Sequence, residues 1–160
     1  MELLTKVIFL DIDGVLLSMR TLRNRHLRIM VGEQLDNDAF DVHCVKNLNL
    51  ILDHVPEAKI VISSSWRLIR DLTELGNMLS KNGIDPGRLV GKTPDDIGRV
   101  PRGKEIQAWL DVHPEVESYI ILDDDSDMLD EQKSSFIKIS GQEGLTDTQA
   151  VLGISLLQIK

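Results

Sequence analysis

The chain has 160 residues, of which 42% are apolar and 28% are charged, and this composition excludes an intrinsically disordered segment. Its 18 basic and 26 acidic side chains give a net charge of −8, which disfavours attraction of nucleic acid or anionic lipid to the whole surface. The single cysteine, Cys44, excludes an intrachain disulfide framework, and the four histidines are too scattered for a typical zinc cluster.

These properties also bound the organisation of the protein. The length suits one domain over residues 1–160. The first apolar run stops at Asp11, which is not typical of a secretion signal, and no run reaches the ~18 apolar residues that a membrane helix needs. We therefore expect a cytoplasmic protein without a membrane span.

Short apolar runs alternate with helical patterns along the chain. The runs at residues 7–10, 60–62 and 119–122 are typical of strands buried on both faces, and weaker strand candidates lie at 88–91 and 136–139. Apolar residues recur at helical spacing over residues 45–55, 72–79 and 106–110, and a capping-box pattern from Thr146 to Gln149 predicts a last helix. This alternation predicts an α/β fold with a mostly parallel sheet.

The segment at about residues 17–40 departs from this alternation. It has no clear period and contains a run of four arginines, namely Arg20, Arg23, Arg25 and Arg28. Such a run is usually a solvated face. Because it follows the first strand directly, we also expect it to form a basic flap-like excursion from the sheet.

Polar side chains follow three of the predicted strands. They are Asp11, Asp13, Ser63, Asp123 and Asp124. Since ligands of open α/β sheets bind at the carboxyl ends of the strands, we expect these groups to converge on one site. Several carboxylates without histidine or thiol suit a hard cation, of which Mg²⁺ is the usual one.

Two other interpretations of the acidic residues are possible from the sequence. Asp11 and Asp13 could form a capping turn after a strand. Residues 123–127 have the acidic spacing of a calcium loop, but Met128 stands where that loop needs glycine and Ser134 where it needs a bidentate glutamate. The calcium interpretation therefore fails.

Four short motifs resemble, in order, those of the haloacid-dehalogenase (HAD) superfamily. They are FLDIDGV at residues 9–15, Ile62-Ser63, the cations Arg102 and Lys104 before a helix, and LDD at residues 122–124. The longer strings ISSSWR at 62–67, RGKEIQAWL at 102–110 and GLT at 144–146 resemble a small branch found in RNA-repair proteins. The resemblance implies a Rossmann-like three-layer sandwich without a full cap domain.

The resemblance also implies roles for the residues of the first motif. Asp11 would be the nucleophile and form an aspartyl-phosphate, while Asp13 would protonate the leaving oxygen and then activate water. The carbonyl of Asp13 would bind the metal. Gly14 would let the chain turn away beside the bound phosphate.

The other motifs would complete the site. Ser63 would donate a hydrogen bond to a phosphate oxygen, Asp123 would be a direct metal ligand, and Asp124 would orient water or the motif cation. Both Arg102 and Lys104 remain candidates for that cation, because the superfamily and the RNA-repair branch place it differently. The expected Mg²⁺ ligands are Asp11, Asp13, Asp123 and Asp124.

Substrate contacts are expected from residues around this centre. Ser64, Trp66 and Arg67 follow the second strand, although Ser64 also suits a turn and Trp66 also suits the core. The four arginines of residues 20–28 would face a polyanionic substrate.

The sequence therefore predicts a Mg²⁺-dependent phosphomonoester hydrolase that forms an aspartyl-phosphate and acts on 3′-terminal phosphates of nucleic acid. The alternatives are a small-molecule phosphatase for nucleotides or sugars, and a receiver-like or non-catalytic phosphate-binding module. The expected partner is a phosphorylated substrate. The oligomeric state is left open.

Overall fold

The computed structural model describes residues 4–35, 38–95 and 99–159. Its elements in chain order are β1 (Lys6–Leu10), α1 (Met19–Met30), α2 (Val42–His54), β2 (Ala58–Ile62), η1 (Ser65–Leu68), α3 (Leu72–Lys81), η2 (Pro86–Arg88), β3 (Leu89–Lys92), α4 (Arg102–Asp111), β4 (Ser118–Asp123), η3 (Asp130–Ser135), β5 (Phe136–Lys138) and α5 (Asp147–Gln158).

The strands form one five-stranded sheet in the order β3-β2-β1-β4-β5, and every neighbouring pair is parallel. In the register of β1, Leu10 lies opposite Ile62 of β2 and Leu122 of β4. The next residues along these strands, Asp11, Ser63 and Asp123, therefore reach the same edge of the sheet. This register is the reason that the polar residues of three distant motifs meet.

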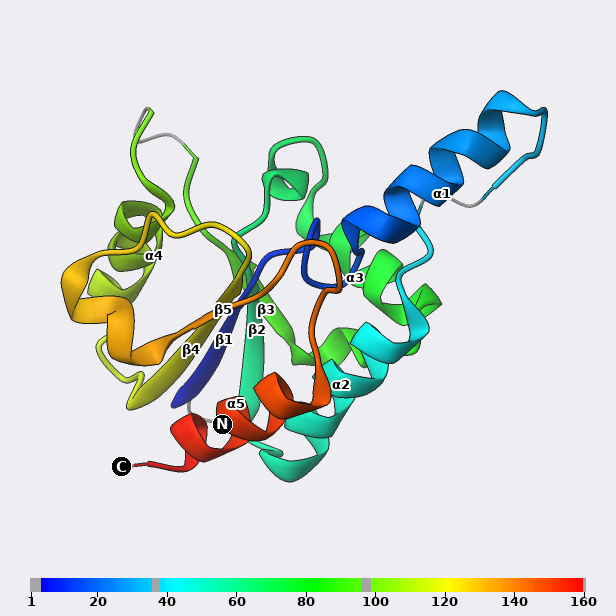
Figure 1. Cartoon of the computed structure of the whole chain (residues 1–160). Coiled ribbons are helices and arrows are strands. Elements are labelled where there is room, and N and C mark those ends of the chain that lie inside the picture. Colours follow the sequence, from blue (N-terminus) through cyan, green and yellow to red (C-terminus); the bar gives the residue numbers. More distant parts are fainter. Residues whose placement is uncertain (1–3, 36–37, 96–98, 160) are drawn as a thin grey trace.

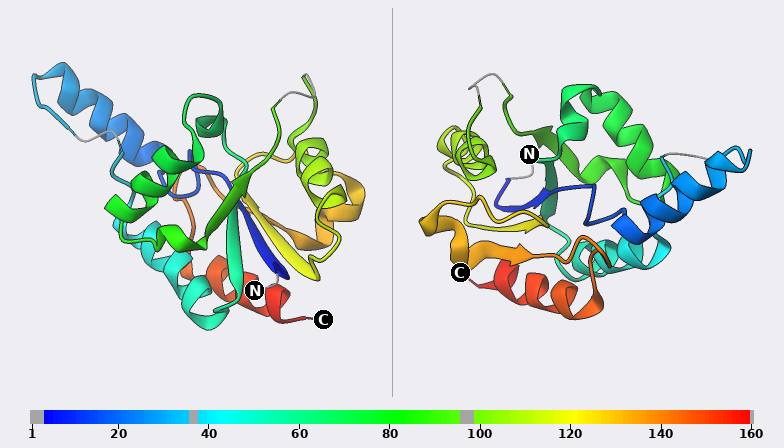
Figure 2. Two further views of the ribbon diagram at one scale, coloured as in Figure 1. Left: turned by 180° about the vertical axis from the view of Figure 1, so that it is seen from behind. Right: turned by 45° about the horizontal axis from the view of Figure 1, so that its top comes forward.

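Helices cover both faces of the sheet, which gives the three layers seen in Figures 1 and 2. The larger core lies on the face of α2, α3 and α5, where alternate strand residues such as Ile8 and Leu10 are buried. The smaller core lies on the face of α4, where Phe9 contacts Trp109 edge to face at 5.5 Å. The predicted Rossmann-like α/β fold with a parallel sheet is confirmed.

The helix termini follow the capping residues of the sequence. Thr146 and Gln149 form the predicted capping box at the start of α5, and Asp41 is the N-cap of α2. The Asp41 carboxylate accepts from the Ser18 backbone N–H at 2.9 Å and from the Thr21 hydroxyl. Asp41 therefore ties the start of α1 to the start of α2.

The arginine-rich excursion contains a regular helix, α1, which the sequence analysis did not predict. Ser18 caps it by accepting from the Thr21 N–H at 3.2 Å. None of its residues is buried, and it extends away from the sheet in Figures 1 and 2. Leu22 packs in part against the core, and a helix with so small an apolar contact has little need of an apolar period, which is why no pattern revealed it. Residues 36–37 of the excursion lie outside the described residues.

None of the helices formed by the described residues is both long enough and apolar enough to cross a membrane.

Candidate active site

The site is centred on Asp11, which directly follows β1. Its backbone N–H donates to the Leu122 carbonyl of β4 at 3.1 Å, so the sheet fixes the position of its main chain. The side chain is buried, and its Oδ1 accepts from the Ile12 N–H at 2.9 Å. At the end of β4, Asp123 is fully buried, and its Oδ1 accepts from the Asp125 N–H at 2.9 Å. Both carboxylates thus have one oxygen engaged by backbone.

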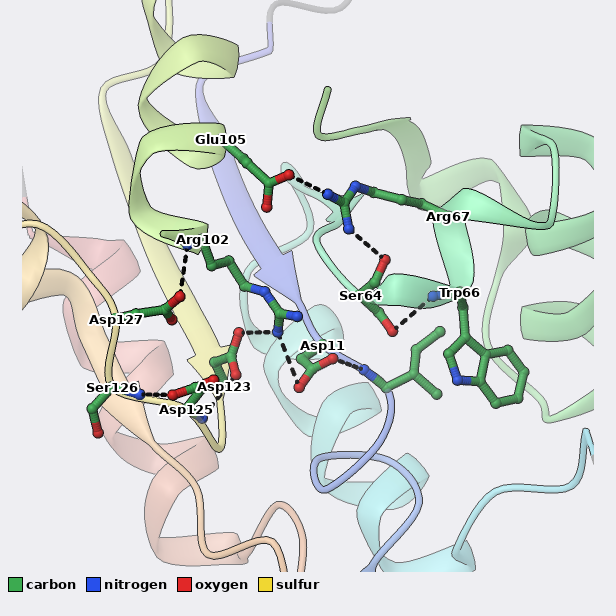
Figure 3. A network of polar contacts seen from close by, with 11 residues as sticks. Asp11, Ser64, Trp66, Arg67, Arg102, Glu105, Asp123, Asp125, Ser126 and Asp127 are labelled. Carbon is green, nitrogen blue, oxygen red and sulfur yellow. Dashed lines mark hydrogen bonds and ion pairs between the residues drawn. The ribbon is translucent and has the colours of Figure 1, made fainter. Parts of the chain in front are cut away.

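The second oxygens of both carboxylates face Arg102, as Figure 3 shows. The Arg102 guanidinium lies 2.6 Å from Asp123 Oδ2 and 3.3 Å from Asp11 Oδ2. Arg102 opens α4, and its backbone N–H donates to Asp127 Oδ2 at 2.8 Å, which supplies the cap that Pro101 lacks. Lys104 is exposed on the same helix. Of the two candidate cations, the fold brings Arg102 to the aspartates.

Asp124 is held against the backbone of two glycines. Gly14 has φ +85°, and a Cβ at this position would collide with the Asp124 carboxylate. A Cβ at Gly141 would lie 3.0 Å from Asp124 Oδ2. Gly14 is therefore required both by its left-handed conformation and by the close approach of Asp124.

The structure brings three of the four expected metal ligands together. One carboxylate oxygen from each of Asp11, Asp123 and Asp124 lies within 4.8 Å of the others. The side chain of Asp13 is not in this group and lines an adjoining pocket. The structure therefore separates the Asp13 side chain from the other three expected ligands.

The charges of the cluster do not balance. Burial and then the charge of Asp123 raise the pKa of Asp11 to about 8, and burial also raises the pKa of Asp123. Although burial opposes it, Asp11 and Asp123 raise the pKa of Arg102 above its usual range, so the guanidinium stays charged. When all three carboxylates are ionised, a single guanidinium leaves excess negative charge, which a further cation would neutralise.

The donor set fits a hard divalent cation. All three ligand groups are carboxylates, and no histidine or thiol belongs to the group among the residues that the structure describes. Oxygen-only sites of this kind suit Mg²⁺, whereas zinc and copper sites favour nitrogen or sulfur ligands.

Two hydroxyls at this edge of the sheet lack a hydrogen-bond partner among the described residues. They are Ser63 Oγ and Thr93 Oγ1, both buried. Ser63 donates its backbone N–H to the Leu10 carbonyl at 3.0 Å, which places it next to Asp11 on the neighbouring strand. Thr93 follows β3, and its N–H donates to the Ile62 carbonyl at 3.0 Å. Thr93 was not among the expected site residues. Its signal in the sequence is its position two residues after the strand candidate at 88–91, with Lys92 between them.

Arg67, expected at the substrate, is instead buried within the protein. Its guanidinium donates to the Thr93 carbonyl at 3.1 Å, to the Ser64 carbonyl at 2.9 Å, and to Glu105. Glu105 lies one turn after Arg102 on α4, so Arg67 joins the loops after β2 and β3 to the helix that carries Arg102 (Figure 3). This geometry corrects the sequence interpretation, because the donors of Arg67 are used inside the fold.

The other expected substrate residues surround the site unevenly. Ser64 caps η1 by accepting from the Trp66 N–H at 3.2 Å, as a turn residue does. Arg25 lines the pocket beside Asp13, whereas Arg20 lines a different groove and Arg28 pairs with Glu33 on the surface. The four arginines of α1 therefore do not share one face, and Arg25 is the member of the run that borders the Asp13 pocket.

Comparison with family models gives one match. Residues 7–150 match the family described as the HAD domain in Swiss Army Knife RNA repair proteins. The chain belongs to this HAD family. Comparison with curated proteins and with solved structures finds no match. Membership of a HAD family supports a hydrolase, in general terms a phosphatase, and it agrees with the resemblance carried by the four motifs.

Proposed function

We propose that this HAD domain is a Mg²⁺-dependent phosphomonoester hydrolase that works through an aspartyl-phosphate on Asp11, with 3′-terminal phosphates of nucleic acid as its substrates. The carboxylates of Asp11, Asp123 and Asp124, together with the backbone carbonyl of Asp13, would hold the metal. When bound, Mg²⁺ would offset the charge of the phosphate and of the aspartates.

In the first half-reaction, a carboxylate oxygen of Asp11 attacks the phosphorus in line with the leaving oxygen. The bond from phosphorus to the leaving oxygen breaks, and Asp13 gives its proton to that oxygen. Arg102 holds the Asp11 and Asp123 carboxylates in place during the attack, because its guanidinium contacts both of them.

In the second half-reaction, water attacks the phosphorus of the aspartyl-phosphate. Asp13, now ionised, takes a proton from the water, and the bond between phosphorus and Asp11 breaks. Inorganic phosphate leaves, and Asp11 returns as a carboxylate. The two steps consume one water molecule for each phosphate ester.

One observation carries this proposal. The Ser63 hydroxyl is fully buried at the edge of the acidic cluster and has no partner among the described residues. An unpaired buried hydroxyl costs folding free energy, of the order of 1–3 kcal/mol. A phosphate oxygen beside Asp11 would accept from this hydroxyl and remove that cost.

The test is a substrate screen with a chemical trap. Purified protein and Mg²⁺ are incubated with 3′- and 5′-phosphorylated oligonucleotides, nucleotides, sugar phosphates and phosphopeptides, and phosphate release is measured. Acid-quenched samples are then examined by mass spectrometry for a phosphoryl group on the peptide that contains Asp11, with Asp11→Asn as the control. Release from the 3′-phosphorylated oligonucleotide together with a labelled Asp11 peptide is the expected result. Turnover without any label would contradict the covalent step.

A further inference from the structure

A pocket of about 410 Å³ is lined by Asp13 and Trp66, and Trp66 lies on the other side of Asp11 from Arg102 in Figure 3. Its walls come from the loop after β1, from α1 and from the segment after β2, and they include Asp13, Leu17, Leu22, Arg25, Trp66 and Ile69. The volume lies in the range of sites for small organic ligands. In the proposed function Asp13 protonates the leaving oxygen, so this pocket lies where the leaving group must extend.

We propose that the pocket binds the nucleoside that carries the phosphate, and that this single nucleoside is the main unit of recognition. The inference rests on the proposed function, because that function makes Asp13 the proton donor to the leaving group. It adds a specificity site, for which Trp66 and Ile69 supply the apolar wall and Arg25 part of the polar rim.

The apolar side chains of the walls favour a flat heteroaromatic ring. Leu22, Trp66 and Ile69 offer apolar surface to the pocket. Ile69 is 79% exposed, so the protein leaves an apolar side chain in solvent at the mouth of the pocket. A base that packs there would cover it.

Trp66 is held in place before any ligand arrives. Its backbone N–H donates to Ser64 Oγ at 3.2 Å, the ring of Phe40 meets its indole edge to face at 6.1 Å, and the Arg70 guanidinium lies 4.4 Å from its ring centre. Such preorganisation reduces the side-chain entropy lost on binding. Figure 3 shows Trp66 and Arg102 on opposite sides of Asp11.

The rim of the pocket carries charges of both signs. Arg70 pairs with Asp38 at 3.0 Å, and the Arg25 guanidinium donates to the Ala39 carbonyl at 2.5 Å. A rim with both donors and acceptors suits the edge of a neutral base, which presents both kinds of group. These ties also keep the rim side chains close to the pocket.

The first experiment compares two substrates that differ only in the base. One is a nucleoside 3′-phosphate and the other is the same sugar phosphate with hydrogen in place of the base. Stacking of a base on an aromatic side chain supports a preference of roughly tenfold in kcat/KM for the wild-type protein. Trp66→Leu and Ile69→Asn should each bring this ratio toward one. Leu68→Asn is the matched control, since Leu68 is exposed in η1 but does not line the pocket, and it should keep the wild-type ratio.

The outcomes separate the pocket from the proposed function. A wild-type ratio of one, or a ratio that survives both Trp66→Leu and Ile69→Asn, would overturn the nucleoside site while leaving a phosphatase. Better turnover of a phosphopeptide or a sugar phosphate than of any nucleoside phosphate would overturn it as well. The Ile69→Asn variant keeps the test decisive if Trp66→Leu fails to fold, because the Ile69 side chain is mostly exposed.

A binding measurement tests the pocket without turnover. The chain has two tryptophans, and Trp109 is buried on the α4 face, stacked on His113 at 3.7 Å. In an Asp11→Asn, Trp109→Phe protein, Trp66 is the remaining indole emitter. A nucleoside 3′-phosphate should quench its fluorescence at concentrations where the base-free sugar phosphate does not. Equal responses to both would overturn the inference. Base-dependent quenching in this variant would retain the pocket even if the protein with Asp11 intact hydrolysed none of the phosphate esters, a result that would reject the proposed function alone.

Discussion

The arginines of this protein are held in two different ways on the two sides of the site. Arg102 contacts two buried aspartates, and Arg67 donates to two carbonyls and to Glu105, so their positions are set by the fold. The arginines of α1 lie on a helix that buries no residue. The difference implies that Arg102 and Arg67 are held in place before a substrate binds, whereas the interactions of the α1 arginines depend on what binds to them.

This comparison can first be tested at the nucleophile. Asp11→Asn keeps the shape of the side chain but removes the attacking charge, so turnover should fall by about 10³ or more. The fold should survive, because the amide oxygen can still accept from the Ile12 backbone N–H. A folded variant that keeps more than a tenth of wild-type turnover would reject Asp11 as the nucleophile.

The buried ion pair between Arg67 and Glu105 should have the next largest effect, on the free energy of unfolding. Glu105→Gln removes the countercharge of Arg67, whose side chain is 5% exposed, and should lower the free energy of unfolding by about 3 kcal/mol. Asp38→Asn is the control, because the side chains of its ion pair are more exposed, Asp38 at 29% and Arg70 at 25%. This substitution should lower the free energy of unfolding by about 1 kcal/mol or less. Chemical denaturation measures both. Equal losses would mean that the Arg67–Glu105 pair contributes no more to the free energy of unfolding than the Arg70–Asp38 pair does.

Metal binding to the carboxylates of Asp11, Asp123 and Asp124 should raise the free energy of unfolding by a comparable amount. At 100 times its dissociation constant, Mg²⁺ should raise the free energy of unfolding by about 2.7 kcal/mol, and EDTA should abolish turnover. Full activity in metal-free buffer would contradict the metal assignment. Activity with Zn²⁺ alone would require a different ligand set.

The pH dependence of the metal-free protein follows from the same residues. The pKa of Asp11 is raised from 3.8 to about 8, so between these values the folded chain holds a proton that the unfolded chain has lost. Stability should therefore fall as pH rises through this window, and it should be greatest below it. Melting temperatures from pH 4 to pH 8 measure this, and the slope should be smaller with Mg²⁺ or in Asp11→Asn. A stability that rises across the window would contradict the raised pKa.

The sequence predicts the acidic side of the site well, for a physical reason. Strands buried on both faces are continuous apolar runs, and parallel strands end at one edge, so the runs before Asp11, Ser63 and Asp123 locate the edge. The choice between Arg102 and Lys104 was not available from the sequence. Two residues apart on a helix, they point in different directions, and only the position of α4 over the sheet decides between them.

Other parts of the site depend on contacts that no local pattern records. Arg67 appears in the sequence as a charged residue after a strand, but carbonyls from two loops and a carboxylate from α4 allow it to be buried. Helix α1 has the opposite property, because it forms although none of its residues is buried. The pocket beside Asp13 is likewise assembled from three separate segments.

The smallest expected effect concerns the exposed arginines of α1. Replacement of Arg20, Arg23 and Arg28 by Gln should leave the melting temperature nearly unchanged, because α1 buries no residue. If these side chains bind phosphates of a single strand, kcat/KM for a long 3′-phosphorylated oligonucleotide should fall. The slope of its logarithm against the logarithm of salt concentration should flatten by about 0.7 for each phosphate that the variant no longer neutralises.

A comparison of short and long substrates tests what the exposed arginines of α1 do. Hydrolysis of p-nitrophenyl phosphate and of a nucleoside 3′-phosphate should change little in the triple variant, because neither substrate extends a chain along α1. Equal losses on short and long substrates would mean that the arginines support the catalytic centre, in conflict with their exposure. No loss on either would mean that they form a solvated face. A loss confined to the long substrate would show that a chain of net charge −8 attracts nucleic acid through positive charge concentrated on one projecting helix.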